Sequence, residues 1–149
     1  MTLHAGEEGV NAHDPGPFIE EMRQVFALGV DRVGHGIITA MDPRLQEAAL
    51  EAGVVLEICP TSNVRTGAVR DEGQMAEIVF VLESAGIPIV IATDGPEMIG
   101  TRLRAEFAML VRLGALSADA ARRAFARAHD VSFIPPSSIG AEAAARAGS

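Results

Sequence analysis

The sequence predicts an α/β protein built around a parallel sheet, and two observations carry that prediction. Short apolar runs alternate along the 149 residues with longer segments in which apolar residues recur at helical spacing. The most apolar run, residues 87–92, is β-branched and apolar on both faces, as a parallel strand covered on both sides must be. The alternation gives four strand–helix units joined by right-handed crossovers.

The first half of the chain contains two of these units. We expect a strand over 2–3, a helix over 18–28, a strand over 31–33 and a helix over 44–52. Gly29 ends the first helix, because glycine readily adopts the left-handed conformation that follows a last helical turn. Asp42 and Pro43 begin the second helix as N-cap and first-turn residues, and Gly53 ends it.

The second half repeats the pattern and adds a further helix. We expect a strand over 54–58, a helix over 74–85, a strand over 87–92 and helices over 101–113 and 117–133. Gly86 closes one helix and Ser117 caps another. No linker divides the chain, so residues 1–149 are predicted to form a single domain. The Ala- and Ser-rich tail, 136–149, is predicted to be disordered or a frayed helix.

Residues suited to catalysis follow each predicted strand. His4 and Glu7 follow the first strand, His35 the second, the turn 59–63 the third and Asp94 the fourth. The carboxyl ends of parallel strands share one edge of a sheet or barrel, where active sites draw residues from several strands. Imidazole and carboxylate groups suit zinc and general acid–base chemistry, so the pattern indicates a hydrolytic metal site.

Composition excludes several classes of function. Twelve basic against twenty acidic residues give a net charge of −8, so no basic surface and no nucleic-acid partner are expected. No apolar run reaches about 18 residues, so no membrane partner is expected. The single cysteine, Cys59, excludes an intramolecular disulfide framework and fits a reducing, cytoplasmic location. It is expected to be a buried small side chain rather than a nucleophile.

Four segments resemble, in the same order, the motifs of the adenosine deaminase family. They are 4–7 (HAGE), 32–36 (RVGHG), 57–63 (EICPTSN) and 93–98 (TDGPEM). That family belongs to the amidohydrolase-like, metal-dependent TIM barrels. The resemblance implies the C-terminal half of a (β/α)8 TIM barrel, about four parallel β/α units. The whole chain would then be one partial metal-dependent hydrolase domain, completed by association.

The resemblance also implies a role for each matching residue. His4 and Asp94 correspond to ligands of a catalytic zinc, which is expected for the complete barrel. Glu7 corresponds to the acid that protonates the purine ring, and His35 to a base or electrostatic stabiliser beside the attacking water. The implied reaction is zinc-dependent hydrolytic deamination of a purine nucleoside, either adenosine or a modified adenosine.

Two departures from the family pattern bear on activity. Gly6 and Gly95 are the predicted substrate-binding residues, but Gly95 stands where the family has a second aspartate that hydrogen-bonds the purine. Substrate choice or rate is therefore expected to suffer. The family's first-strand His-x-His pair, which supplies two more zinc ligands, is absent from the sequence. Only His4 and Asp94 are expected as ligands, fewer than a catalytic zinc site normally has.

The likeness to half a barrel predicts association. Residues 2–3 are too few for a complete barrel strand, so the chain is expected to begin within the fifth strand. A half barrel exposes two sheet edges and the interior of its sheet to water. We therefore expect a homo-oligomer, or pairing with a separate N-terminal half barrel. His13 and His129 are expected to be surface residues.

Three functions stay open at this point. The first is a deaminase-family polypeptide that acts on a small-molecule purine nucleoside and is truncated and inactive alone. The second is a degenerate, metal-free half barrel that acts as a binding or interaction protein. The third is a hydrolase of another small amine, because one fold hosts many chemistries.

Overall fold

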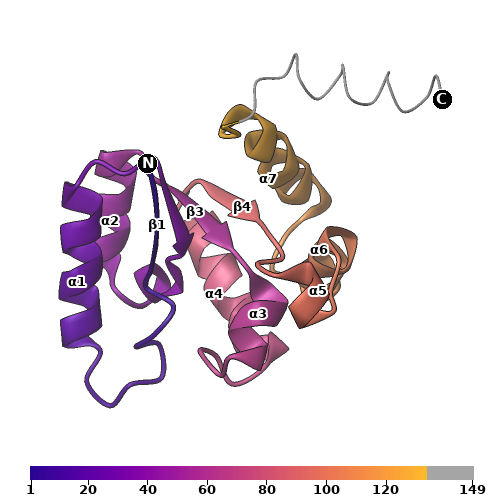
Figure 1. Ribbon diagram of the computed structural model, residues 1–149, viewed down its shortest axis with the longest axis horizontal. Coiled ribbons are helices and arrows are strands. Elements are labelled where there is room, and N and C mark those ends of the chain that lie inside the picture. The colour runs from indigo at the N-terminus through magenta and orange to yellow at the C-terminus, as the bar shows by residue number, and fades with distance from the viewer. Residues whose placement is uncertain (134–149) are drawn as a thin grey trace.

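The computed structural model describes residues 1–133 and contains a four-stranded parallel sheet in the order β1-β2-β3-β4 (Figure 1). The strands are β1 (Thr2–Ala5), β2 (Arg32–His35), β3 (Val55–Ile58) and β4 (Ile89–Ile91). Sequential order and parallel pairing confirm the predicted strand–helix units. The predicted tail, 136–149, lies outside the described residues.

Helices follow every strand. They are α1 (Gly16–Ala27), the 3-10 helix η1 (Ile37–Met41), α2 (Pro43–Ala52), α3 (Pro60–Arg65), α4 (Glu72–Ser84), α5 (Pro96–Ile99), α6 (Leu103–Arg112) and α7 (Ala118–Asp130). The predicted caps are confirmed: the Asp42 side chain accepts from two backbone N–H groups of α2, and Ser117 accepts from Ala120. The segment 59–63, expected as a turn, instead begins α3.

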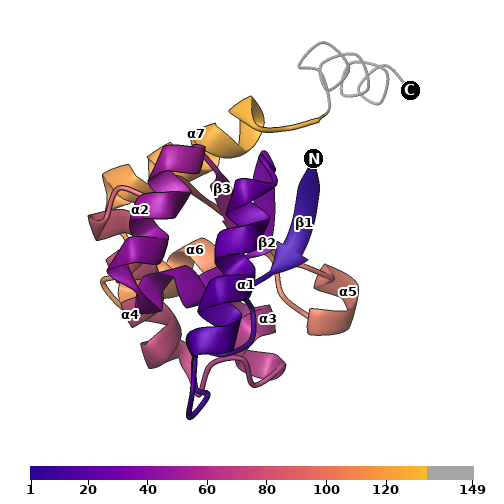
Figure 2. The ribbon, with the colours of Figure 1, turned by 90° about the vertical axis from the view of Figure 1, so that its left-hand side faces the viewer.

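The hydrophobic core lies between the sheet and the helices that follow its strands. Val33, Leu56 and Ile89, which lie side by side on β2, β3 and β4, are fully buried in it. Met22 of α1 and Leu45 of α2 enter the same core, and these two helices lie side by side (Figures 1 and 2). The apolar residues of the strands therefore fix which face of the sheet the helices cover.

The opposite face of the sheet is partly polar. The strand register aligns His4, Gly34 and Glu57 across β1, β2 and β3. Arg32, at the start of β2, lies 3.2 Å from the Glu57 carboxylate, and its guanidinium stacks over the Phe133 ring at 4.1 Å. This face therefore carries charged side chains, unlike the apolar face under the helices.

The last helix covers part of the sheet edge. β4 is an edge strand, and α7 packs beside it (Figure 1). Arg127 of α7 donates a hydrogen bond to the Ile89 carbonyl at 2.7 Å. Covering an edge strand in this way occupies a backbone acceptor that would otherwise be open to another chain.

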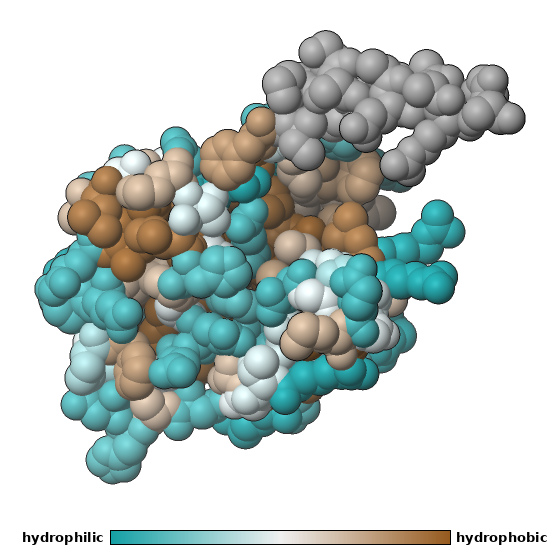
Figure 3. Space-filling model, in the orientation of Figure 1, coloured by the Kyte–Doolittle hydropathy of each residue, from teal (hydrophilic) through white to brown (hydrophobic). Residues whose placement is uncertain are grey.

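The outer surface is mixed. Hydrophilic side chains cover much of the face seen in Figure 3, with apolar patches between them. Within residues 1–133, no helix combines the length and apolar character needed to cross a bilayer.

Candidate active site

His4 and His35 meet at the carboxyl ends of β1 and β2. Their ring centroids lie 5.4 Å apart with the rings at 72°, an edge-to-face contact. The register places Gly34 directly beside His4, and a Cβ at Gly34 would lie 2.9 Å from His4 Cδ2. Glycine at this position therefore leaves the space that the His4 imidazole occupies.

The end of β2 is a tight, left-handed turn. His35 has φ 65° and is 4% exposed, and Gly36 follows with φ 64°. A non-glycine residue with positive φ is uncommon and holds strain that the surroundings must offset. The Gly36 N–H donates to the Ala5 carbonyl at 2.8 Å, so β1 helps to hold the turn in place.

A hydrogen-bonded cluster surrounds Glu7. Asn63 of α3 donates from Nδ2 to Glu7 Oε1 at 3.2 Å, and the same nitrogen lies 3.0 Å from His35 Nδ1. Thr66 donates to Glu7 Oε1 at 2.9 Å. The other carboxylate oxygen, Oε2, lies 3.7 Å from His35 Nε2. These contacts bring the two predicted catalytic residues, Glu7 and His35, into one group.

Asp94 follows β4 and is held differently. It also has a positive φ, 58°, but it is exposed. Its Oδ2 accepts a hydrogen bond from Ser62 of α3 at 2.8 Å, and Gly95 follows it directly before α5. Because Ser62 precedes Asn63, one turn of α3 contacts both the Asp94 carboxylate and the Glu7–His35 pair.

A buried carboxylate also holds the start of α3. Glu106 of α6 is 1% exposed and accepts a hydrogen bond from the Thr61 N–H at 3.0 Å. Its other oxygen accepts one from the Thr101 hydroxyl. A buried carboxylate needs such partners. Glu106 therefore ties the start of α3 to the segment that leads from Asp94 into α6.

A cavity of about 210 Å³ opens beside the cluster. Its lining consists of His4, Ala5, Gly6, Glu7, Glu8, Phe18, Glu21 and His35. Gly6, predicted to bind substrate, is thus part of the wall, and its φ of 66° suits glycine. Asp94 and Gly95 are not in this wall. The catalytic, metal and substrate roles of these residues stay predictions.

Cys59, at the start of α3, is buried as expected. Burial, together with a smaller contribution from the negative charge of Asp94, raises the pKa of its thiol to about 12. Its Sγ lies 3.6 Å from the Glu57 carbonyl. A protonated thiol is a weak nucleophile, so this side chain acts as part of the packing.

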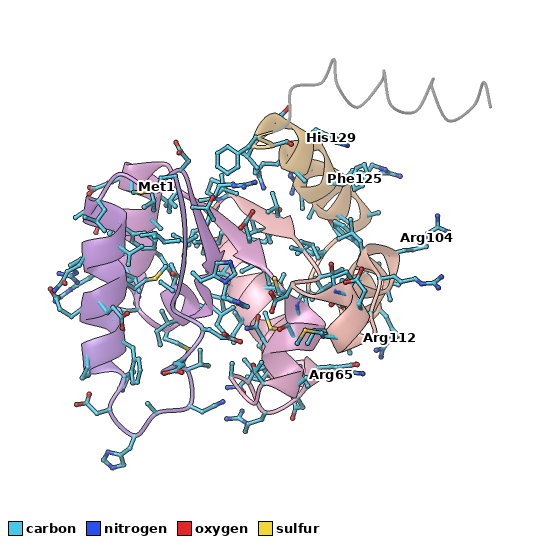
Figure 4. All side chains as sticks on the ribbon, viewed as in Figure 1. Met1, Arg65, Arg104, Arg112, Phe125 and His129 are labelled. Atoms are coloured by element: carbon cyan, nitrogen blue, oxygen red, sulfur yellow. The ribbon has the colours of Figure 1, made fainter. Side chains whose placement is uncertain are left out.

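The described residues do not form a complete metal site. Within residues 1–133, no three His, Cys, Asp or Glu side chains come together as ligands, whereas a catalytic zinc normally has three from the protein. His4 and Asp94 would supply two at most. His13 and His129 are exposed, as expected, and His129 lies on α7, away from the strand ends (Figure 4).

The sequence reading missed three residues that organise the site. Ser62 and Asn63 lie in the segment 59–63, which was expected as a turn after the third strand, and no sequence pattern assigned a role to Glu106. Pro60, a residue favoured at the first position of a helix, signalled α3. Glu106 shares the buried face of α6 with Met109 and Leu110, which marks it as a buried acid that needs partners.

Comparisons with known proteins agree with these motifs. A family model described as adenosine deaminase matches residues 1–139. An aminodeoxyfutalosine deaminase of Acidothermus cellulolyticus is 40% identical over 115 residues, which are 76% of this chain and 32% of the relative. An adenosine deaminase of Pectobacterium atrosepticum is 35% identical over 135 residues, 90% of this chain and 37% of the relative.

A solved structure shows the same arrangement of strands and helices. The adenine deaminase of Arthrobacter aurescens superposes with a TM-score of 0.71 at 27% identity. The match covers 91% of this chain and 39% of that one. The chain thus spans between about a third and two-fifths of the length of these three relatives.

Proposed function

The chain belongs to the adenosine deaminase family, and on that premise we propose that it carries the acid–base part of an active site for hydrolytic deamination of a purine nucleoside. One observation carries the proposal. Glu7 and His35 share the buried amide of Asn63 and face one cavity. The names of two relatives, adenosine deaminase and aminodeoxyfutalosine deaminase, agree with an amino-bearing purine substrate.

In the proposed reaction, water adds to the ring carbon that carries the amino group. Glu7 takes up a proton when the substrate binds and gives it to the adjacent ring nitrogen as the water oxygen bonds to carbon. The carbon–nitrogen bond to the amino group then breaks: one proton of the added water leaves with ammonia, and the other returns to Glu7. In the net reaction, water replaces the amino group of the ring by a carbonyl oxygen and releases ammonia.

We propose zinc as the metal of the complete site. Bound zinc makes water a nucleophile at neutral pH. His4 and Asp94 would be two of its ligands, and further ligands would come from outside the described residues. Ser62 would orient the Asp94 carboxylate through its hydrogen bond of 2.8 Å.

The chain is proposed to act as part of a complete barrel. Three observations support this. The parallel sheet has β1 and β4 at its edges, and the described residues supply at most two of the proposed zinc ligands. The chain also matches only 32% of the length of the Acidothermus relative. The partner is proposed to be an N-terminal half barrel or, in a homo-oligomer, a second copy of this chain. Alone, the chain is expected to be inactive.

A chimaera tests the proposal. This chain replaces the matching segment of the Pectobacterium adenosine deaminase, and ammonia release is measured with adenosine, aminodeoxyfutalosine and adenine. We expect zinc-dependent release that falls by about 100-fold or more in Glu7→Gln, because proton donation contributes about 10²–10⁴-fold. Glu77→Gln, which changes an exposed acid on α4, is the matched control.

Each outcome decides between the functions. A folded, zinc-loaded chimaera that releases no ammonia would contradict deaminase chemistry, and a folded chimaera that binds no zinc would favour the metal-free binding protein. Release from a different small amine alone would favour the third function. If the fusion does not fold, this chain is co-expressed with the rest of the same relative, and the same assay is applied to the two-chain complex.

A further inference from the structure

We propose that Asn63 is a positioning residue that fixes which ring nitrogen of neutral His35 carries the hydrogen. Asn63 is fully buried, and its amide nitrogen contacts both Glu7 Oε1 and His35 Nδ1, at 3.2 and 3.0 Å. The inference adds to the proposed function, because it assigns a role to Asn63 and selects between the two roles that stay open for His35.

Glu7 determines the orientation of the amide. The two hydrogens of Nδ2 have two acceptors, the carboxylate oxygen and Nδ1, whereas the buried Oδ1 has no partner among the described residues. The reversed amide would place Oδ1 3.2 Å from the Glu7 carboxylate and would leave two N–H donors without acceptors. An amide has two donors and a carboxylate only acceptors, so the observed orientation makes more hydrogen bonds.

The amide orientation then sets the tautomer of His35. Because Nδ1 accepts a hydrogen bond from Asn63, it carries no hydrogen, and the hydrogen of the neutral ring lies on Nε2. Nε2 in turn faces Glu7 Oε2 at 3.7 Å. A carboxylate favours an N–H rather than a lone pair at this position. The contacts of Nδ1 and of Nε2 therefore indicate the same tautomer, with the hydrogen on Nε2.

Thr66 strengthens this arrangement. Its hydroxyl donates to Glu7 Oε1, the oxygen that also accepts from Asn63, at 2.9 Å. Both donors therefore engage Oε1, and Oε2 is left on the side of His35. Two contacts on one oxygen keep the carboxylate from rotating away from the imidazole.

The tautomer has a chemical consequence. A neutral His35 with its hydrogen on Nε2 presents a donor toward Glu7 and the cavity, and it cannot take a proton at that nitrogen. His35 is therefore assigned to hydrogen-bond donation and electrostatic stabilisation, not to base catalysis. This role depends on the proposed function, whereas the tautomer itself follows from the contacts alone.

Nitrogen-15 NMR of the 149-residue chain tests the tautomer directly. Histidine is labelled with 15N, the pH is set so that the ring is neutral, and the His35 signals are assigned by their loss in His35→Gln. We expect the unprotonated-type signal at Nδ1 and the N–H-type signal at Nε2. The opposite assignment in the wild-type chain would overturn the inference.

Variants of Asn63 test its causal role. Asn63→Leu has similar volume but no donor, and it is expected to remove the tautomer preference. Asn63→Asp places an acceptor beside Nδ1 and is expected to move the hydrogen to that nitrogen. Asn11→Asp is the matched control, because Asn11 is the other asparagine of the sequence and bonds to Gln74 and Arg70 instead.

The outcomes separate this inference from the proposed function. An unchanged His35 pattern in folded Asn63→Leu would show that another group sets the tautomer and would overturn it. If one of the two variants fails to fold, the wild-type signals and the remaining variant still test whether Asn63 sets the tautomer. Ammonia release with the hydrogen on Nδ1 would refute this inference alone, and the expected tautomer without ammonia release would refute the proposed function alone.

Discussion

The ends of β2 and β4 have the same backbone conformation but different support. His35 and Asp94 both have positive φ, 65° and 58°, at the point where a parallel strand turns into the site. His35 is 4% exposed, contacts Asn63 and is followed by Gly36 packed on the core. Asp94 is exposed, and its side chain has a hydrogen bond from Ser62.

This difference separates two parts of one site. Backbone strain persists where the surroundings over-determine it, and the β2 end has such surroundings in this chain. The Asp94 carboxylate keeps one oxygen, Oδ1, without a hydrogen bond from the residues that the structure describes. The β2 end is therefore held by several contacts within the chain, whereas the exposed Asp94 carboxylate at the β4 end is held by one hydrogen bond.

The largest expected effect comes from the core beneath the β2 end. Leu56 is fully buried, and its Cδ2 approaches Gly36. Leu56→Ala is expected to lower the free energy of unfolding by about 2–5 kcal/mol, because it removes buried methyl groups and leaves a cavity. Urea denaturation followed by circular dichroism measures it. Leu50→Ala, at a position 45% exposed, should cost less than about 1 kcal/mol, and equal costs would contradict the assignment of the core.

Replacing His35 and Asp94 by glycine, one at a time, measures how strongly the surroundings hold each of the two strand ends. His35→Gly removes a buried ring and leaves the Asn63 donor unpaired, so we expect a cost of about 2–3 kcal/mol. Asp94→Gly loses one hydrogen bond but relieves the left-handed strain, so its net effect should lie within about 1 kcal/mol of zero. Similar losses at both positions would show that the two ends are equally supported.

Glycine substitutions sharpen the account of the β2 turn. Gly36 and Gly53 share a φ of about 64°. Only at Gly36 would a Cβ meet a neighbour, Leu56 Cδ2 at 2.8 Å, whereas nothing lies within 4 Å at Gly53. Gly36→Ala should therefore cost about 1–2 kcal/mol more than Gly53→Ala in thermal unfolding. A difference near zero would mean that the turn has room to relax.

The smallest effect at neutral pH concerns Cys59. Burial raises the pKa of its thiol from 9.0 to about 12. The unfolded chain therefore binds fewer protons than the folded chain above pH 9. The stability that the neutral thiol contributes is complete below pH 9 and is lost as the pH rises toward about 12. The free energy of unfolding, measured by urea denaturation, should fall as the pH rises across this range, and Cys59→Ala should reduce that fall. An identical pH dependence in the variant would contradict the assignment.

Much of this fold follows from local signals in the sequence. The apolar run 87–92 predicted the buried strand β4, and Asp42 and Ser117 predicted the starts of two helices. The shared edge of parallel strands also predicted that His4 and His35 would meet, because this depends on topology rather than on side-chain detail.

The organisation of the site could not be predicted in the same way. Asn63 reaches Glu7 across 56 positions of sequence, and the Thr61 N–H reaches Glu106 across 45. These contacts depend on the orientation of α3 above the strand ends, which no local pattern encodes. A short helix that begins at Pro60 is a local signal, but which of its side chains face the site is a property of the packed structure.

Zinc content tests the central claim that the β2 end is complete while the metal ligands are only partly present. The 149-residue chain and the chimaera are each dialysed against zinc, and bound metal is measured per chain. The account predicts no stoichiometric zinc in the chain alone and one zinc in the chimaera, lost in His4→Ala and Asp94→Ala. One tightly held zinc in the chain alone, or a zinc in the chimaera that survives both substitutions, would contradict it.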